Sequence, residues 1–339
     1  MAKRALITGF TGMVGSHLAD FLIKNTDWEI FGICRWRSNM ENIEHLIDKA
    51  NSNSRINILY GDLNDSASLD KNIKDSLPDY VFHLGAQSYP KTSFDSPADT
   101  LTTNIIGTVN LLEAIRAFKD SNLINPVVHV CASSEVFGRV PKDKIPIVED
   151  ERFHPASPYA ISKVGTDLVG RFYGEAYDMK VMTTRMFTHT GPRRGDVFAE
   201  SSFAKQIAMI EAGLISPVIK VGNLNSLRTF LDVRDAVRAY FMLVTINPMS
   251  GEYYNIGGTH TCEIGDMLNH LIGISTSKDI EVVVDKDRLR PIDADLQVPD
   301  TTKFTNHTGW SPEISFDQTM QDLLDFWRDK ISSGNYLDR

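Results

Sequence analysis

Short apolar runs recur along the first half of the chain, and segments with helical spacing separate them. The runs predict six buried strands, at Ala5–Thr8, Trp28–Cys34, Ile56–Tyr60, Asp79–Leu84, Val127–Cys131 and Val181–Phe187. Helices are predicted at 16–22, at 104–115 and from Pro158 onward. Apolar strands that alternate with helices are typical of a parallel sheet covered on both faces. The sequence therefore predicts an α/β fold with a Rossmann-type, doubly wound parallel sheet.

The length of the chain predicts a second domain. At 339 residues it exceeds one typical domain. We assign residues 1–187, with a returning segment at about 230–258, to the sheet domain. Residues 188–229 and 259–330 are predicted to form a smaller C-terminal α/β domain.

A glycine-rich turn follows the first strand directly, in Gly9-Phe-Thr-Gly12-Met-Val-Gly15. Glycines permit a tight turn and let the backbone approach a pyrophosphate, which the positive end of the next helix attracts. Glycine triads alone are weak signals, but the position between a strand and a helix makes this one informative. We predict a dinucleotide site that contains the three glycines and the intervening Thr11, Met13 and Val14.

The residues after the second strand indicate which dinucleotide binds. Arg35, Arg37 and Ser38 follow the strand that ends at Cys34, and the next acid is Glu41. An acid at this position usually bonds the ribose 2′-hydroxyl of NAD, whereas arginine accommodates the 2′-phosphate of NADP. We therefore predict NADP as the cofactor.

The ends of the third and fourth strands complete the predicted cofactor site. Asp62 can accept a hydrogen bond from the adenine amino group, and Leu63 can pack near the ring. Small residues after the fourth strand let the backbone pass close beside a cofactor. This part of the predicted site comprises Leu84, Gly85, Ala86 and Ser88.

Tyr159 and Lys163 carry the clearest chemical signal. Pro158 suits the first turn of a helix, and residues i and i+4 of a helix share one face. A free tyrosine has a pKa of about 10, and a neighbouring positive charge favours the phenolate. Ser133 follows the fifth strand, at the sheet edge where ligands bind. The three side chains predict proton transfer beside the dinucleotide.

Together these motifs resemble the extended short-chain dehydrogenase/reductase family, in its nucleotide-sugar-modifying branch. The resemblance covers essentially the whole chain. Within the branch, the chain is most similar to GDP-mannose 4,6-dehydratases and to their neighbours, the GDP-4-keto-6-deoxymannose reductases. The segments that carry the similarity include Arg35-x-Arg-Ser38, Ala132-Ser-Ser-Glu-Val-Phe-Gly138 and His189-Thr-Gly-Pro-Arg-Arg-Gly195.

The resemblance implies a role for each of these residues. In the dehydratases a tyrosine takes the C4 hydroxyl proton while hydride leaves C4 for NADP⁺, so Tyr159 would be the base and Lys163 would tune it. Ser133 would bond the sugar O4, and Glu135 would remove the C5 proton and protonate the departing O6. The hydride then returns to C6. The GDP-sugar site implied by the resemblance comprises Gln87, Ser134, Thr188, Arg193, Val221, Arg228 and Arg290.

Two other functions stay open. An NADPH-dependent GDP-4-keto-6-deoxymannose 4-reductase needs the tyrosine, lysine and serine but has no step for Glu135. Thr188-His-Thr-Gly-Pro192 and Ser201-Ser202 depart from the usual dehydratase sequence toward the reductase. A non-catalytic nucleotide-sugar- or NADP-binding protein is the second alternative, although a pure binder has no reason to keep the complete catalytic set.

The composition of the chain bears on its expected partners and on its cellular compartment. The net charge is −9 and no run of basic residues occurs, so neither nucleic acid nor a membrane surface is an expected partner. No apolar stretch approaches the ~20 residues of a membrane span, and no secretory signal is evident. Cys34, Cys131 and Cys262 are scattered and predict neither a disulfide framework nor a metal site. We expect a cytoplasmic enzyme, and the family resemblance implies a homodimer or homotetramer.

Overall fold

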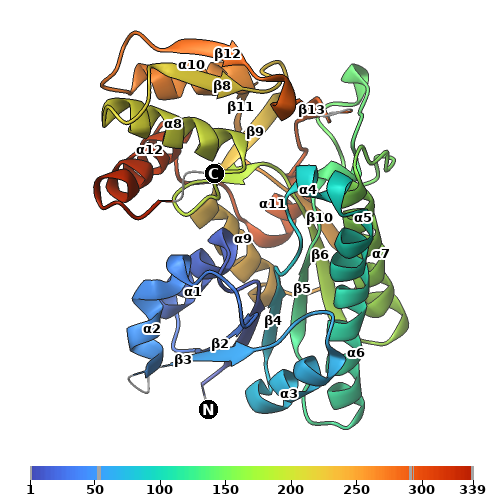
Figure 1. Ribbon diagram of the computed structural model, residues 1–339. Coiled ribbons are helices and arrows are strands. Elements are labelled where there is room, and N and C mark those ends of the chain that lie inside the picture. The colour runs from blue at the N-terminus through green and yellow to red at the C-terminus, as the bar shows by residue number, and fades with distance from the viewer. Residues whose placement is uncertain (1, 52–54, 290–291, 293, 337–339) are drawn as a thin grey trace.

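Seven parallel strands form a sheet in the computed structural model, which describes residues 2–51, 55–289, 292 and 294–336 (Figure 1). Their order is β10-β6-β5-β4-β1-β2-β3. The strands are β1 (Arg4–Thr8), β2 (Glu29–Cys34), β3 (Ile56–Tyr60), β4 (Tyr80–His83), β5 (Val127–Cys131), β6 (Lys180–Met186) and β10 (Tyr253–Ile256). The sheet grows from β1 in both directions, which confirms the predicted doubly wound topology.

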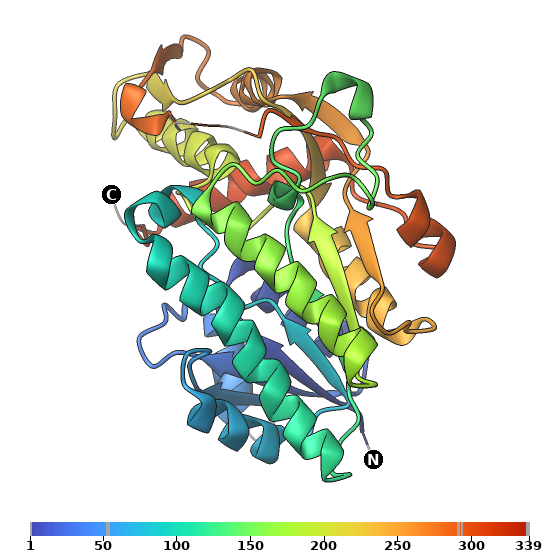
Figure 2. The same ribbon diagram turned by 90° about the vertical axis from the view of Figure 1, so that its right-hand side faces the viewer.

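Helices cover both faces of this sheet (Figures 1 and 2). Alternate residues of β1 explain why: Ala5 and Ile7 join one apolar core, whereas Leu6 joins the other. The first core includes side chains of α1 (Met13–Asn25) and α9 (Val233–Thr245). The second includes side chains of α3 (Ser66–Ser76), α6 (Gly107–Asp120) and α7 (Pro158–Ala176). We call the seven-stranded sheet and these helices the sheet lobe.

Shorter elements connect the strands of the sheet lobe. A π-helical turn, η2, precedes α6, so the predicted helix at 104–115 begins in a wider turn than expected. The connecting elements are η1 (Glu41–Ile43), α2 (Glu44–Asn51), α4 (Pro90–Asp95), α5 (Pro97–Leu101), η2 (Thr102–Ile106), η3 (Ser134–Val136) and η4 (Lys142–Lys144).

A small lobe lies above the carboxyl ends of the strands (Figure 1). In it β9 pairs with β7, β11 and β13, and β8 pairs with β12. Its strands are β7 (His189–Thr190), β8 (Val218–Val221), β9 (Leu227–Asp232), β11 (His260–Glu263), β12 (Glu281–Val284) and β13 (Leu296–Gln297). Its helices are α8 (Ala199–Glu211), α10 (Ile264–Gly273), η5 (Lys286–Arg288) and α12 (Phe316–Ser332), and α8, α10 and α12 share one apolar core. The remaining helix, α11 (Thr302–Thr308), contributes Phe304 to the core under α9.

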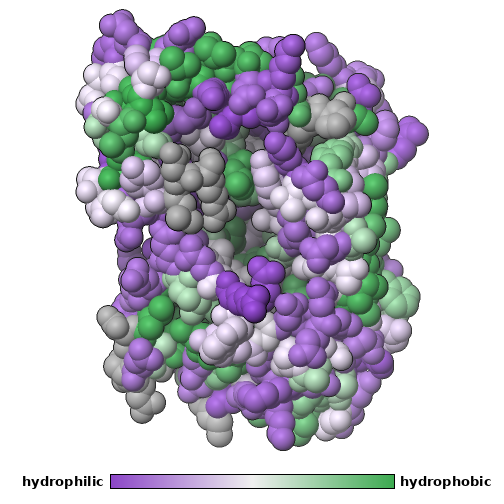
Figure 3. Space-filling view, viewed as in Figure 1, coloured by the Kyte–Doolittle hydropathy of each residue, from purple (hydrophilic) through white to green (hydrophobic). Residues whose placement is uncertain are grey.

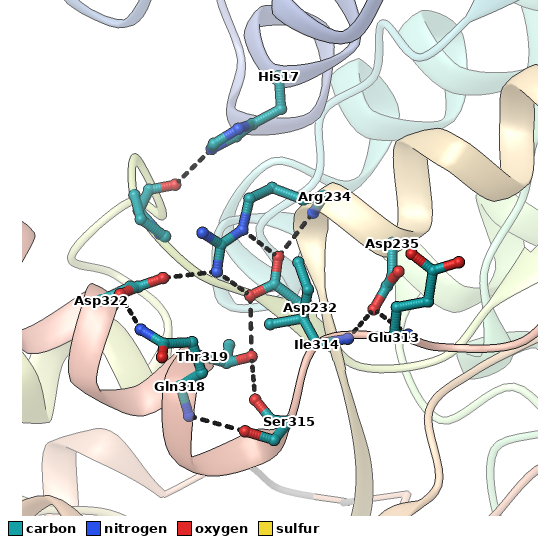
Figure 4. Close-up of polar contacts among 11 residues, drawn as sticks. His17, Asp232, Arg234, Asp235, Glu313, Ile314, Ser315, Gln318, Thr319 and Asp322 are labelled. Carbon is teal, nitrogen blue, oxygen red and sulfur yellow. Dashed lines mark hydrogen bonds and ion pairs between the residues drawn. The ribbon is translucent and has the colours of Figure 1, made fainter.

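A polar network joins the start of α9 to α12 (Figure 4). Asp232 caps α9, because its Oδ1 accepts from the Arg234 N–H at 2.8 Å. Its Oδ2 accepts from the Thr319 hydroxyl at 2.8 Å and pairs with the Arg234 guanidinium at 2.7 Å. Arg234 also pairs with Asp322 of α12 at 2.6 Å. This buried carboxylate therefore fixes the small lobe to the helix that returns to the sheet.

None of the helices in the described part of the chain is both long and apolar enough to cross a membrane.

Candidate active site

A cleft of about 960 Å³ opens between the two lobes, and Figure 3 shows the hollow from the outside. We call its residues between 8 and 163 the sheet wall and those between 186 and 288 the small-lobe wall. The predicted site residues that line it are Gly9, Thr11, Gly12, Met13, Val14, Gly15, Arg35, Ser38, Asp62, Leu63, Leu84, Gly85, Ala86, Gln87, Ser88, Ser133, Ser134, Glu135, Tyr159, Lys163, Thr188, Arg193 and Arg228.

Three predicted site residues are not placed in this cleft. The exposed Arg37 does not line it. Val221 is fully buried in the core of the small lobe, and the adjacent Gly222 lines the cleft instead. Successive residues of a strand point to opposite faces, so the Val221 side chain faces the core rather than the cleft. Its predicted contact with the substrate stays a prediction. Arg290 lies outside the described residues.

The glycine turn is shaped to hold an anion at the start of α1. A Cβ on Gly15 would lie 2.4 Å from the Gly9 carbonyl oxygen, so the turn requires glycine there. A Cβ on Gly12 would meet a single neighbour, that same oxygen at 3.2 Å, and space remains on its cleft side. Gly12 leaves the first turn of α1 without a side-chain cap, and no acid stands in that turn. These features fit a dinucleotide diphosphate, which free N–H groups at a helix N-terminus attract.

The cleft continues past this turn to the residues that follow β2. Arg35 is exposed there, and its guanidinium has no ion-pair partner within the described ranges. Asn42 also lines the cleft and donates from Nδ2 to the Thr11 carbonyl at 3.1 Å. Sequence reasoning missed Asn42, because nothing in the local pattern links it to the glycine turn 31 residues earlier.

Helix α7 presents Tyr159 and Lys163 to the cleft. Ser157 caps the helix by accepting from the Ala160 N–H at 3.0 Å, and Pro158 opens it as predicted. Lys163 is buried and donates from Nζ to the Cys131 carbonyl at 2.8 Å, at the end of β5. Burial lowers the pKa of Lys163.

The pKa of Tyr159 is raised in this structure, contrary to the expectation from the sequence. Burial is the main cause, and the neighbouring Glu135 carboxylate adds to it. A hydrogen bond with Ser133 and the charge of Arg194 act in the opposite direction without outweighing burial. The phenol is therefore protonated at neutral pH in the protein alone.

Glu135 lies beside this phenol, and its carboxylate has no partner among the described residues. Its backbone N–H donates to the Ser133 hydroxyl at 3.2 Å, which fixes η3 at the end of β5. The side chain is half-buried and lines the cleft. Its carboxylate makes no hydrogen bond or ion pair with any residue that the structure describes. A carboxylate in this position can accept a proton from a bound molecule or return one.

A buried amide that the sequence did not reveal holds the loop after β4. Asn104 accepts from the Gln87 N–H at 2.8 Å and donates to the Gln87 carbonyl at 2.9 Å. It also donates to the Ser162 hydroxyl of α7 at 2.8 Å. Asn104 belongs to the π-helical turn η2, so this turn links the Gln87 loop to the helix that carries Tyr159 and Lys163.

Beneath the same loop, a buried histidine is held neutral. His83 of β4 makes hydrogen bonds to the hydroxyls of Thr8 at 2.8 Å and Thr108 at 2.9 Å. Burial, and then the charge of Lys163, lowers the pKa of His83 to about 3. Among the described residues, no group of three His, Cys, Asp or Glu side chains is placed to hold a metal ion.

Arginines of the small-lobe wall are paired with carboxylates. Arg193 pairs with Asp20 of α1 at 2.7 Å. Arg194 pairs with Glu200 of α8 at 3.0 Å, and its guanidinium lies 3.5 Å from the centre of the Phe198 ring. These pairs bring the loop 191–195 against both lobes.

Two further residues of this wall gave no signal in the sequence. Arg288 of η5 lines the cleft and donates to the Ser202 hydroxyl at 3.1 Å. Glu200 is almost fully buried beside the cleft. Both depend on contacts between segments, which local patterns do not report.

Comparison with known proteins identifies the family of this chain. Residues 6–323 match the family model described as GDP-mannose 4,6 dehydratase. The chain belongs to the GDP-mannose 4,6-dehydratase family. The resemblance predicted from the glycine turn, the Ser133 segment and the Tyr159–Lys163 pair is therefore confirmed.

Individual relatives of this family include both activities that the sequence left open. The chain is 33% identical to a GDP-mannose 4,6 dehydratase of Homo sapiens, over 94% of this chain and 90% of that protein. It is 30% identical to a GDP-6-deoxy-D-mannose reductase of Pseudomonas aeruginosa, over 98% of this chain and 99% of that protein.

Solved structures agree with the fold of the family. The structure of RMD from Pseudomonas aeruginosa complexed with NADPH has a TM-score of 0.81 and 29% identity, over 97% of this chain and 100% of that one. A UDP-glucose 4-epimerase of Thermotoga maritima with UDP-glucose has a TM-score of 0.83 and 25% identity, over 96% and 99%. These relatives hold a nicotinamide dinucleotide or a nucleotide sugar.

Proposed function

We propose that this chain is an NADP-dependent nucleotide-sugar 4,6-dehydratase, which converts GDP-mannose or a related GDP-sugar to the GDP-4-keto-6-deoxy sugar. The observation that carries the proposal is the uncommitted Glu135 carboxylate beside Tyr159 in the cleft. A ketone reductase has no step for such a group, whereas a dehydratase needs one acid/base in addition to the tyrosine.

The chain's own residues divide the proton transfers. Tyr159 takes the proton from the sugar C4 hydroxyl, and Ser133 bonds the C4 oxygen. A bound NADP supplies hydride acceptance at C4 and its return to C6. Once C4 is a ketone, the C5 proton is acidic, and Glu135 removes it and protonates the departing O6. Water leaves, and a proton equivalent to the one that Tyr159 took returns to C5 as the hydride returns to C6. The cofactor therefore ends in its starting redox state.

Protonation of Tyr159 in the protein alone suits this order. Its raised pKa keeps the proton on the phenol until a positive charge lies beside it. The oxidised nicotinamide ring carries such a charge. Lys163, held by the Cys131 carbonyl at 2.8 Å, would then bond the nicotinamide ribose.

The walls of the cleft support the choice of ligands. Arg35 and the absence of an acid before Glu41 favour NADP over NAD, because a guanidinium binds a 2′-phosphate well. Arg193, Arg194 and Arg228 reach the cleft on the small-lobe wall, where an anionic diphosphate would be bound. The assignment of guanine as the nucleotide base and of mannose as the sugar rests on the family membership.

The wider predictions from the sequence belong to this proposal too. We assign the cofactor to 1–187 with 230–258, and the sugar nucleotide to 188–229 with 259–330. We also propose a cytoplasmic homodimer or homotetramer, as the family resemblance implies. Light scattering of the purified protein measures the subunit number.

A GDP-4-keto-6-deoxymannose 4-reductase is the second candidate. The serine at position 202 favours it, because Ser202 lines the cleft where the dehydratases usually carry a basic residue. A reductase would use Ser133, Tyr159 and Lys163 in the same places and consume NADPH at each turnover. The Glu135 carboxylate would then have no chemical role.

One experiment separates the candidates. The purified protein is incubated with GDP-mannose and a trace of NADP⁺, without NADPH, and the mass of the sugar nucleotide is measured by mass spectrometry. Loss of one water without net reduction of cofactor supports the dehydratase, and Glu135→Gln should then abolish that loss while NADP⁺ still binds. Stoichiometric NADPH oxidation with GDP-4-keto-6-deoxymannose, and no dehydration, would replace it by the reductase. Binding of both ligands without turnover would favour the non-catalytic alternative.

A further inference from the structure

The last helix of the small lobe reaches back to the loop that follows β2. Lys330 of α12 forms an ion pair with Glu41 of η1. Figure 1 shows α12 on the same side of the molecule as α1 and α2. Lys330 is thus a small-lobe residue that acts on a part of the sheet lobe far from it in sequence.

Glu41 stands next to the proposed site of the NADP 2′-phosphate. Arg35, Ser38 and Asn42 all line the cleft, whereas Glu41 does not. Its Oε1 is engaged by Lys330 and its Oε2 accepts from the Asn39 amide at 3.4 Å. An unpaired carboxylate in this short loop would repel a phosphate and could bond a ribose 2′-hydroxyl instead.

The position of the Lys330 ammonium is well defined. Only 18% of its side chain is exposed. The ammonium lies 5.0 Å from the centre of the Trp327 ring and 5.5 Å from that of Phe326. The Trp327 indole N–H donates to the Ser201 hydroxyl at 2.8 Å, which anchors this face of α12 to α8. Lys330 is therefore held over two aromatic rings with its charge directed at Glu41.

We propose that Lys330 is a specificity-determining residue for the cofactor. It neutralises Glu41 and holds that carboxylate out of the cleft, which leaves Arg35 and Ser38 to receive a 2′-phosphate. The inference rests on the NADP assignment in the proposed function, but it is independent of the reaction that the protein catalyses. Selectivity between NADP and NAD is expected from the loop after β2 alone, and Lys330 adds a residue of the small lobe to it.

Lys330→Met tests the proposal through binding constants rather than turnover. The substitution keeps the aliphatic stem over Trp327 and removes the charge. We expect the Kd for NADP⁺, measured by calorimetry, to rise about fivefold while the Kd for NAD⁺ stays constant or falls. The change should shrink at high salt, because the Debye length is then shorter.

Lys303→Met is the matched control. Lys303 also pairs with a glutamate, Glu252 at 2.6 Å, and lies over the rings of Tyr253 and Tyr254 at 4.3 and 5.0 Å. Its partner Glu252 does not stand in the loop after β2 and does not line the cleft, so the loss of Lys303 should leave both Kd values unchanged.

The double variant Lys330→Met/Glu41→Gln decides the mechanism. Restoration of the wild-type NADP⁺ affinity would support the proposal, because the weaker binding of Lys330→Met would then come from the unpaired Glu41 carboxylate. An unchanged ratio of the two Kd values in Lys330→Met would overturn it, as would a defect that persists in the double variant. If the wild type binds neither NADP⁺ nor NAD⁺, the cofactor assignment itself fails, whatever the variants do.

Discussion

The two walls of the cleft differ in how their polar groups are balanced. At the sheet wall the polar groups are held by hydrogen bonds: the glycine turn offers backbone N–H groups, and beneath the loop after β4 the uncharged His83 lies between two threonine hydroxyls. On the small-lobe wall Arg193 and Arg194 are each matched by a carboxylate from another element. The sheet wall is thus fixed by hydrogen bonds around strand ends, and the small-lobe wall by ion pairs between segments.

We interpret this difference as a division of roles between the two walls. A cofactor that must keep one position through a complete redox cycle needs a rigid wall, which hydrogen bonds between strand ends and loops provide. A substrate that carries a diphosphate must instead meet cations, and cations without ligand are stabilised by nearby acids. Substitutions on the sheet wall should therefore affect chemistry and folding, and those on the small-lobe wall should affect substrate binding.

The largest effect is expected at Tyr159 on the sheet wall. Tyr159→Phe removes the group that exchanges a proton with the sugar, so kcat should fall by about a thousandfold or more. NADP⁺ binding should persist, because the ring remains in place. Tyr173→Phe is the control: this tyrosine of the same helix donates to Glu113 away from the cleft. Equal losses in both variants would show that helix α7, rather than the phenol, was damaged.

The next effect tests whether the glycine turn is a fixed part of the sheet wall. In Gly15→Ala the added methyl would lie 2.4 Å from the Gly9 carbonyl oxygen, so the turn must open. We expect a loss of about 1–3 kcal/mol in the free energy of unfolding and no measurable NADP⁺ binding. Denaturant unfolding and calorimetry measure the two.

Gly273→Ala provides the comparison for that result. No atom lies within 4 Å of a Cβ built on Gly273, at the end of α10 in the small lobe. Its stability and cofactor binding should match those of the wild type. A Gly15→Ala protein that binds NADP⁺ normally would show that the turn can adapt, which contradicts the rigid sheet wall.

The sheet wall could be predicted from the sequence because its parts are local. The glycine turn, the Pro158 helix start and the four-residue spacing of Tyr159 and Lys163 each lie within one strand-to-helix connection. Periodicity alone then placed these connections at one edge of the sheet.

The small-lobe wall could not be predicted in the same way. The Arg288–Ser202 contact joins residues 86 positions apart, and Arg193 meets an acid 173 positions away. The family resemblance gave Val221 without the direction of its side chain, which the structure places in the core of the small lobe. In a strand, one position decides between core and cleft.

A third prediction concerns the ion pairs of the small-lobe wall. Glu200→Gln removes the buried partner of Arg194 and leaves its guanidinium free to turn away from the cleft. We expect KM for the sugar nucleotide to rise about tenfold while the Kd for NADP⁺ is unchanged. Steady-state kinetics and calorimetry separate the two readouts.

Glu211→Gln is the matched control for Glu200. Glu211 lies on the same helix, and it pairs with Arg328 at 2.7 Å outside the cleft. This variant should lower stability without changing KM. A similar rise of KM in both would mean that α8 as a whole had shifted, and that the Arg194 pair carries no specific role.

The smallest effect concerns the neutral histidine beneath the sheet wall and is measured by changing the pH. The pKa of His83 is lowered to about 3 in the folded protein, below the unfolded value of about 6.5. Protonation then favours the unfolded chain, so stability is complete above pH 6.5 and is lost as the pH falls from there toward 3. Between about pH 7 and about pH 5.5 one such histidine lowers the free energy of unfolding by about 1 kcal/mol.

In His83→Gln that part of the decline should vanish, whatever the absolute stability of the variant. Denaturant unfolding at the two pH values measures it. Glu211 should not interfere, because burial alone would raise its pKa, but hydrogen bonds led by Arg328 lower it to about 2, so its contribution disappears only below about pH 4.5. An undiminished slope in His83→Gln would show that the decline comes from other groups and that His83 is not a neutral hydrogen-bonding group beneath the sheet wall.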